Sequence, residues 1–168
     1  GSWQVPRDFS RQKMQFQSLV GLCRYPGKGL LFTDSRLNTI YLLSNDSKSI
    51  APFGPPSIWN QPTGIAYLSR KAEIWVAETT AHCITILDSS GKKGRSFGSR
   101  GSMPGFFNYP TSIWLDQKGR AYVVDALNFR VQVFDEEGNY LWSFGSSGNA
   151  TGYMARPKGI ALDSYGNI

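Results

Sequence analysis

One five-residue motif decides the fold. It stands as PTGIA at 62–66, returns as PTSIW at 110–114, and returns again as PKGIA at 157–161. The motif begins 48 and then 47 residues after its previous copy. A fixed period of this length is typical of a repeat protein in which each repeat is one small structural unit.

Other short patterns keep the same period and the same order. Phe-Gly pairs close successive units at 53–54, 97–98 and 144–145, and AEIWVAE at 72–78 aligns with RAYVVD at 120–125. ITILD at 84–88 likewise aligns with VQVFD at 131–135. Turn signals such as DQKG at 116–119 and EEGN at 136–139 separate these segments, which indicates hairpin connections.

Each unit therefore predicts four short antiparallel strands, which we name A to D in chain order. Four strands repeated every 40 to 50 residues are the pattern of a β-propeller blade. We predict an all-β, partial β-propeller of about three to three and a half blades. Its units span 19–54, 62–98, 110–145 and an incomplete 157–168.

The third unit carries the clearest likeness to a known family. FGSRGSMPGFFNYP at 97–110 and AYVVDALNFRVQVFD at 121–135 resemble an NHL repeat, most closely those of bacterial six-bladed NHL proteins. The second unit departs from the pattern, with Ala81 and Cys83 where the third has Asn128 and Arg130. The resemblance implies an interaction platform rather than an enzyme.

Composition agrees with a turn-rich β protein. Glycine makes up 18 of 168 residues and aromatic residues 14%, whereas charged residues make up only 18% against about 25% in an average domain. The formal net charge is +6, which permits an acidic partner. Since the basic residues are spread out and only 92–95 forms a cluster, the pattern favours a solvated surface over a nucleic-acid groove.

The residues give little sign of catalytic chemistry. His82 is the one histidine, so the chain alone offers no three-histidine zinc site, and we interpret His82 as a loop residue. Asp34, Glu78 and Asp125 occupy the same position in successive units, which indicates turn or backbone capping. We expect no catalytic residue, no metal and no cofactor, and interpret Cys23 and Cys83 as free thiols.

The connections from strand D to the next strand A are rich in aromatic rings and arginine, as are the B–C turns on the same face. Aromatic residues and arginine are enriched at binding hot spots. The candidate binding residues are Arg100, Phe106, Tyr109, Asn128, Phe129, Arg130, Tyr153 and Arg156. We expect Phe107 and Met154 instead to wedge between blades.

Three functions follow in order of preference. The first is a non-catalytic scaffold with a protein or ligand partner, and the second is a domain that binds single-stranded RNA, as TRIM-NHL proteins do. The third is a zinc lyase, as in the relatives that cleave α-hydroxyglycine peptides; the lone histidine disfavours it. No apolar run approaches a membrane span. The compartment is left open, and a bacterial extracytoplasmic location is compatible with the sequence.

The chain is short for a closed propeller, and we expect a fragment. We interpret residues 1–18 as an N-terminal extension or outer strand. Gly1-Ser2 resembles the residues that an expression vector leaves at an N-terminus. Two alternatives stay open. Residues 13–18 could pair with the C-terminal piece, or two chains could self-associate to complete one ring.

Overall fold

Three antiparallel sheets make up the computed structural model, which describes residues 15–55, 58–148, 150–163 and 165–168. Each sheet is a four-stranded meander in which neighbours in the chain are neighbours in the sheet. The first sheet contains β1 (Leu19–Tyr25), β2 (Gly29–Asp34), β3 (Thr39–Ser44) and β4 (Ile50–Phe53). The prediction of four-stranded antiparallel units is confirmed.

The second and third sheets repeat this arrangement. The second contains β5 (Pro62–Leu68), β6 (Glu73–Glu78), β7 (Cys83–Leu87) and β8 (Lys93–Phe97). The third contains β9 (Pro110–Leu115), β10 (Ala121–Asp125), β11 (Arg130–Phe134) and β12 (Tyr140–Phe144), with one turn of 3-10 helix, η2 (Ala126–Asn128), between β10 and β11.

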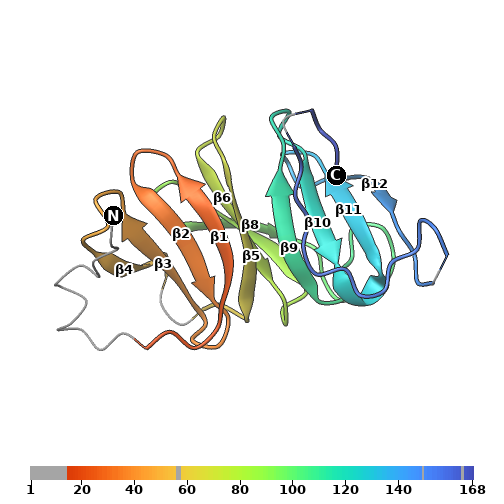
Figure 1. The fold of residues 1–168 in the computed structure, drawn as a ribbon, viewed down its shortest axis with the longest axis horizontal. Helices are drawn as coiled ribbons and strands as arrows, with labels where there is room; N and C mark the ends of the chain where they lie inside the picture. The colour runs from red at the N-terminus through yellow and green to blue at the C-terminus, as the bar shows by residue number, and fades with distance from the viewer. Residues whose placement is uncertain (1–14, 56–57, 149, 164) are drawn as a thin grey trace, which may run out of the picture.

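The sheets stand side by side like the blades of a fan, with β1, β5 and β9 adjacent to one another (Figure 1). Two apolar layers join them, because each strand alternates its side chains between the two neighbouring sheets. Leu31, Ile40 and Ile74 belong to the layer between the first and second sheets. Trp75, Phe107 and Phe134 belong to the layer between the second and third.

Gly64 of the motif, and Gly21 at the equivalent place in the first unit, leave room where the inner strands meet. A Cβ added to Gly64 would lie 2.8 Å from the Cα of Ser112, which is too close for an ordinary carbon contact. A Cβ on Gly21 would overlap the carbonyl oxygen of Thr63. Small residues are therefore needed where neighbouring inner strands approach one another.

The three motif prolines occupy matching places. Pro62 pairs with Glu78 and Pro110 with Asp125, the last residue of the adjacent strand in each case. The residues directly before Pro62, Pro110 and Pro157 share a left-handed conformation, with φ of 55°, 56° and 53°. The third proline thus follows the same backbone geometry as the other two.

The fourth unit differs from its expected strands. Within the described residues, 157–168 form no strand, although the turn that begins at Asp163 has the hydrogen bonds of the equivalent turn in the third unit. The amide of Asp163 donates to the carbonyl of Asn167, as Asp116 does to Arg120. A strand A pairs with the strand B that follows this turn, and in this sequence Ile168 alone follows it.

Residues 15–18 form no strand either, so the described part of the expected 13–18 outer strand does not pair with the C-terminal piece. Instead the amides of Gln17 and Ser18 donate to the Asp34 carboxylate, just before β1 begins. Residues 1–14 lie outside the described residues. In the described ranges no helix is long and apolar enough to cross a bilayer.

Candidate functional site

The loop face is the edge of the sheets formed by the B–C turns and by the connections between sheets. Second and fourth strands of a meander run in the same direction, so these segments emerge at one edge. The turns span 35–38, 79–82 and 126–129, and the connections span 54–61, 98–109 and 145–156. All eight candidate binding residues lie on this face or directly beside it.

One buried carboxylate per sheet anchors the chain as it enters the first strand. Asp34 receives the amides of Gln17 and Ser18, at 2.7 and 3.1 Å. Glu78 and Asp125 receive the equivalent amides of Asn60 and Asn108, at 2.9 and 2.6 Å. The prediction that these acids cap backbone amides is confirmed.

The geometry also sets the charge of Asp34. Burial opposes ionisation, but four backbone N–H donors together hold the pKa of the Asp34 carboxyl below its ordinary value of 3.8. A carboxylate that accepts several amide hydrogens is favoured in its charged form. The Asp34 carboxylate therefore binds backbone amides of its own chain.

Around Asp125 a polar network fixes the 98–109 connection. The carboxylate receives hydrogen bonds from the Nδ2 of Asn128, the Nε of Arg130 and the Nε2 of Gln132, at 2.8, 2.9 and 3.0 Å. The same three side chains also donate to carbonyl oxygens of the connection. These carbonyls belong to Gly101, Met103 and Phe106, at 2.7 to 3.1 Å. Side chains three, five and seven residues after Asp125 thus fasten this connection to the third sheet.

The second sheet lacks this network and has a shorter connection to hold. Ala81, Cys83 and Thr85 stand where the third sheet has Asn128, Arg130 and Gln132, and Thr85 donates its hydroxyl to Glu78 at 2.5 Å. The connection before this sheet, 54–61, has eight residues, whereas 98–109 and 145–156 have twelve. Among the described residues, the network of Asn, Arg and Gln side chains is formed with the carbonyls of 98–109.

The 145–156 connection repeats the fold of 98–109 with other side chains. The amide of Met154 donates to Ser146, as that of Phe107 donates to Ser99, at 2.8 and 2.9 Å. Phe107 is fully buried between sheets, and Met154 packs on the apolar layer outside the third sheet. Phe107 thus lies between two blades, as predicted, whereas Met154 contacts one sheet only, because the described part of 157–168 forms no fourth sheet.

Four candidate residues are exposed on the loop face. Phe106 is 43% exposed and Tyr153 50% exposed, and Arg100 and Arg156 are exposed as well. Neither arginine forms an ion pair within the described residues. These side chains are free to contact a partner.

The other four candidates are engaged within the protein. The side chain of Arg130 is only 13% exposed and pairs with the buried Asp125, and Asn128 belongs to the same network. Tyr109 and Phe129 are half-buried and adopt left-handed conformations. These residues shape the face more than they extend from it.

His82 is a buried turn residue on this face. Its Nδ1 accepts the amide hydrogen of Tyr109 at 3.2 Å, and its ring meets that of Tyr109 edge-on. Burial, followed by the positive charge of Arg100, lowers the pKa of the imidazole below its ordinary value of 6.5. This hydrogen bond requires an unprotonated Nδ1, because a protonated Nδ1 cannot accept the amide hydrogen of Tyr109.

The described residues contain no group of three or more His, Cys, Asp or Glu side chains that could hold a metal ion. Cys23 and Cys83 are both free. Burial raises the pKa of the Cys23 thiol to about 12, which leaves it protonated at neutral pH. Thiols in this state are poor nucleophiles.

Charge is segregated between the two edges of the sheets. The carboxylates on the loop face, Asp34, Glu78 and Asp125, are all buried. The other described carboxylates lie at the opposite edge, in or beside the A–B and C–D turns: Asp46, Glu73, Asp88, Asp116, Asp135, Glu136, Glu137 and Asp163. The exposed charge of the described loop face is therefore positive.

Asp125 and Gln132 belong to the polar network, although the sequence pattern predicts only a cap for Asp125 and no site role for Gln132. The signal is DALNFRVQV at 125–133, where Asn128, Arg130 and Gln132 alternate with apolar residues. A polar side chain predicted inside a buried strand needs a partner, and here the partners are carbonyls of the neighbouring connection.

The solved structures that resemble the chain share its arrangement of blades. A streptogramin B lyase superposes with a TM-score of 0.69 and 17% identity, over 92% of this chain and 48% of that one. The virginiamycin B lyase of Staphylococcus aureus superposes with a TM-score of 0.67 and 16% identity, over 90% and 48%. The fold is that of a partial β-propeller.

A third similar structure comes from a nidogen/laminin complex, with a TM-score of 0.61 and 17% identity, over 76% of this propeller chain and 47% of that one. The chain spans about half the length of the structures that it matches. No protein-family model and no curated protein matches it. At these identities the likeness concerns the propeller fold alone.

Proposed function

We propose that this chain is a non-catalytic binding module of the NHL type, belonging to a six-bladed propeller whose loop face takes a protein or another ligand. The NHL assignment is supported by the repeated Pro-x-Gly, the acid at the end of strand B and the N-x-R pattern of 128–130. A rigid propeller that presents loops on one face suits such a role.

The fastened 98–109 connection is the observation that carries this proposal. Its backbone is held by three side chains of the third sheet, while Arg100, Met103 and Phe106 remain exposed. A connection held in one conformation loses little conformational entropy on binding. Exposed arginine and aromatic side chains on such a support are suited to act as anchors.

Affinity capture with paired variants tests the proposal. The 168-residue protein, the double variant Arg100→Ala with Phe106→Ala, and the control Lys48→Ala with Lys71→Ala at the opposite edge are immobilised, and the captured proteins are quantified by mass spectrometry. We expect a partner that the wild type and the control retain and that the loop-face variant loses. Equal capture by all three proteins would refute a loop-face binding site.

Single-stranded RNA is the second candidate ligand, and the segregation of charge favours it. Arg36, Arg100 and Arg156 are exposed on the described loop face, where every carboxylate is buried. Cationic side chains interspersed with aromatic rings such as Phe106 and Tyr153 suit phosphates and stacked bases. The Arg130 side chain is less suited, because it is committed to Asp125.

Fluorescence anisotropy with labelled single-stranded RNA separates the two candidates. If the ligand is RNA, affinity falls steeply between 50 and 200 mM salt, by about tenfold or more, and Arg100→Ala with Arg156→Ala weakens it further. Absence of binding at 50 mM salt, or binding that is insensitive to salt, excludes the RNA alternative and leaves the protein partner.

A further inference from the structure

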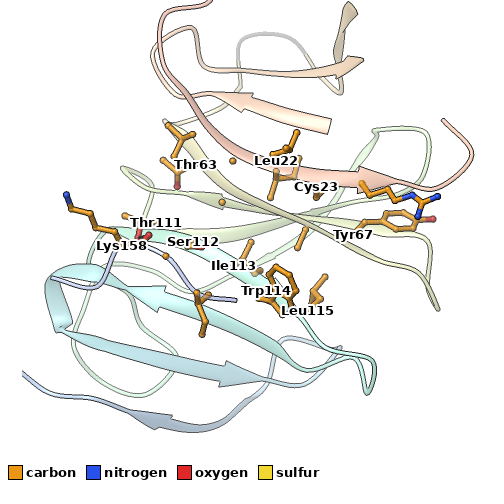
Figure 2. A pocket seen from close by; sticks show the side chains of 18 of the residues that line it. Leu22, Cys23, Thr63, Tyr67, Thr111, Ser112, Ile113, Trp114, Leu115 and Lys158 are labelled. Carbon is orange, nitrogen blue, oxygen red and sulfur yellow. Dashed lines mark hydrogen bonds between the residues drawn. The ribbon is translucent and has the colours of Figure 1, made fainter. Parts of the chain in front are cut away.

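The inner strands border an open cavity that is separate from the loop-face side chains described above. It has a volume of about 830 Å³ and is lined by residues of β1, β5 and β9 and by 158–160 of the fourth unit. Figure 2 shows Leu22 and Cys23 on one side of it and Ile113, Trp114 and Leu115 on another. This volume lies within the usual range of small-molecule sites.

The repeat places the lining residues at two levels along the parallel inner strands. Lys158 is equivalent to Thr63 and Thr111, the second residue of each motif. Because Gly21 is equivalent to Gly64, Arg24 is level with Tyr67, which lies four residues beyond Thr63. Four residues of a strand span about 13 Å, and Figure 2 shows Lys158 and Tyr67 at opposite ends of the cavity.

The cavity is cationic because both ends carry an exposed basic residue and the lining contains no carboxylate. Arg24 and Lys158 are exposed, and neither forms an ion pair with a described carboxylate. Asp116 and Asp163 follow lining strands, but Asp116 pairs with Arg120 and Asp163 caps its own turn. Neither carboxylate lines the cavity.

Between these ends the wall is apolar and uncovered. Leu22 is 65% exposed and Trp114 is 39% exposed, although both belong to strands whose other faces are packed in the core. Uncovered apolar side chains rimmed by charge mark binding sites in soluble proteins. A ligand for this cavity therefore needs an apolar body as well as negative charge.

We propose that this cavity binds an elongated organic anion, whose apolar or aromatic body lies against Leu22 and Trp114. Its anionic groups bind Arg24 at one end and Lys158 at the other. The Tyr67 hydroxyl, level with Arg24 on the neighbouring strand, is placed to donate a hydrogen bond to the same anionic group.

Binding of 8-anilinonaphthalene-1-sulfonate, an aromatic sulfonate, tests this site on the 168-residue protein. Titration should show saturable binding of one dye per chain, with blue-shifted emission. We expect Arg24→Gln and Lys158→Gln each to raise the Kd about three- to fivefold, as for a solvent-accessible ion pair, and the double variant to raise it further. The charge-matched control Lys48→Gln, in an exposed turn, should leave the Kd unchanged.

The uncharged dye N-phenyl-1-naphthylamine distinguishes charge recognition from general apolar adsorption. We expect both glutamine variants to bind it as the wild type does, and Trp114→Ser to weaken both dyes. Circular dichroism melts identify any variant that fails to fold, and either charge variant alone suffices for the comparison. Non-saturable dye binding, or equal Kd values for Arg24→Gln, Lys158→Gln and Lys48→Gln, would overturn the proposal.

Sulfonate binding at the cavity should not depend on the loop-face side chains. Arg100→Ala with Phe106→Ala should leave sulfonate binding unchanged, because these side chains do not line the cavity. Loss of sulfonate binding in that variant would contradict the assignment of the dye to the inner strands.

Discussion

Gly64 shows how a single hydrogen atom in place of a side chain determines the distance between sheets. An added Cβ would meet the Cα of Ser112 and the amide nitrogen of Ile113 in β9, both at 2.8 Å. Backbone atoms cannot yield as the end of a flexible side chain can. The sheets must therefore separate if this residue gains a methyl group.

We predict that Gly64→Ala destabilises the protein by about 2 kcal/mol, the usual cost of overpacking a close-packed interior. Gly159→Ala is the matched control, since Gly159 is the equivalent residue of the fourth unit and an added Cβ there meets nothing within 4 Å. Urea denaturation measures both. A Gly64→Ala midpoint equal to that of Gly159→Ala would contradict the close approach.

His82 is a second residue whose surroundings, rather than its type, decide its behaviour. Since its folded-state pKa lies below 6.5, the unfolded chain binds the proton more readily than the folded one. Its contribution to stability is thus complete above about pH 6.5 and is lost as the pH falls toward and through the folded-state pKa.

We predict that His82→Phe removes this part of the pH dependence. Phenylalanine occupies the equivalent position as Phe129 with nearly the same φ, 55° against 56°, so the backbone accepts it. The measurement is the difference in unfolding free energy between wild type and variant, from pH 7.5 down to pH 5. A difference that stays constant over this range would show that His82 does not titrate between the two states.

At the scale of the element, the 98–109 connection depends on the third sheet for its conformation. Arg130 has a particular weight, because it neutralises Asp125, which is fully buried. Removal of one partner from a buried ion pair leaves an uncompensated charge, which costs about 3 kcal/mol or more. Removal of one partner from the surface pair of Arg95 with Glu73 should cost less than about 1 kcal/mol.

We predict that Arg130→Met lowers stability by about 3 kcal/mol and that it exposes the 99–107 amides to hydrogen exchange. Arg95→Met, the control with the same chemical change at an exposed pair, should do neither. Mass-spectrometric hydrogen exchange and urea denaturation provide the two measurements. Unchanged hydrogen exchange of the 98–109 connection in Arg130→Met would contradict the proposal that Arg130 holds this connection in place.

The whole molecule presents an uncovered apolar side chain on each of its outermost sheets. Leu19, 56% exposed, belongs to β1 of the first sheet, and Trp142, 40% exposed, belongs to β12 of the third. A single blade cannot bury both of its faces, and stacking on another blade is the usual remedy. Both outer sheets should therefore adhere to further blades.

We predict that the 168-residue protein self-associates as its concentration rises and that Leu19→Ser with Trp142→Ser raises the dissociation constant at least about tenfold, because each buried side chain of this size is worth about 1.5 to 3 kcal/mol. Sedimentation velocity measures the association. Met103→Ser is the control, since Met103 is 68% exposed but lies on the loop face. An equal effect of the control would place the association elsewhere.

Much of the fold could be predicted from local features. Strand order, turn positions and the A-to-D pattern follow from alternation and from turn residues such as Asp116 and Asp135, whose carboxylates cap the amides two and four residues ahead. These are interactions within a few residues, so they are visible in the sequence. The wedge role of Phe107 was also accessible, since an apolar side chain in a loop needs a buried place.

The site was less predictable, because its contacts join residues far apart in the chain. The residue types of Arg130 and Phe129 both predict contacts at the surface. In the structure, however, Arg130 donates hydrogen bonds to Asp125 and to carbonyls 24 to 27 residues earlier. Arg100 and Arg156 have the same chemistry and are exposed. Residue type cannot separate these cases, since the separation depends on what the folded chain places beside each guanidinium.

The amino-acid sequence by itself determined the repeat, the four-stranded unit and the caps of its turns, because each of these arises from contacts between near neighbours in the chain. The tertiary structure alone determined which arginines have no ion-pair partner among the described residues. It also determined that Gly64 has no room for a side chain and that Arg24 and Lys158 border one cavity. Those properties arise where separate sheets meet, and the distance between two sheets is a property of packing that no single unit contains.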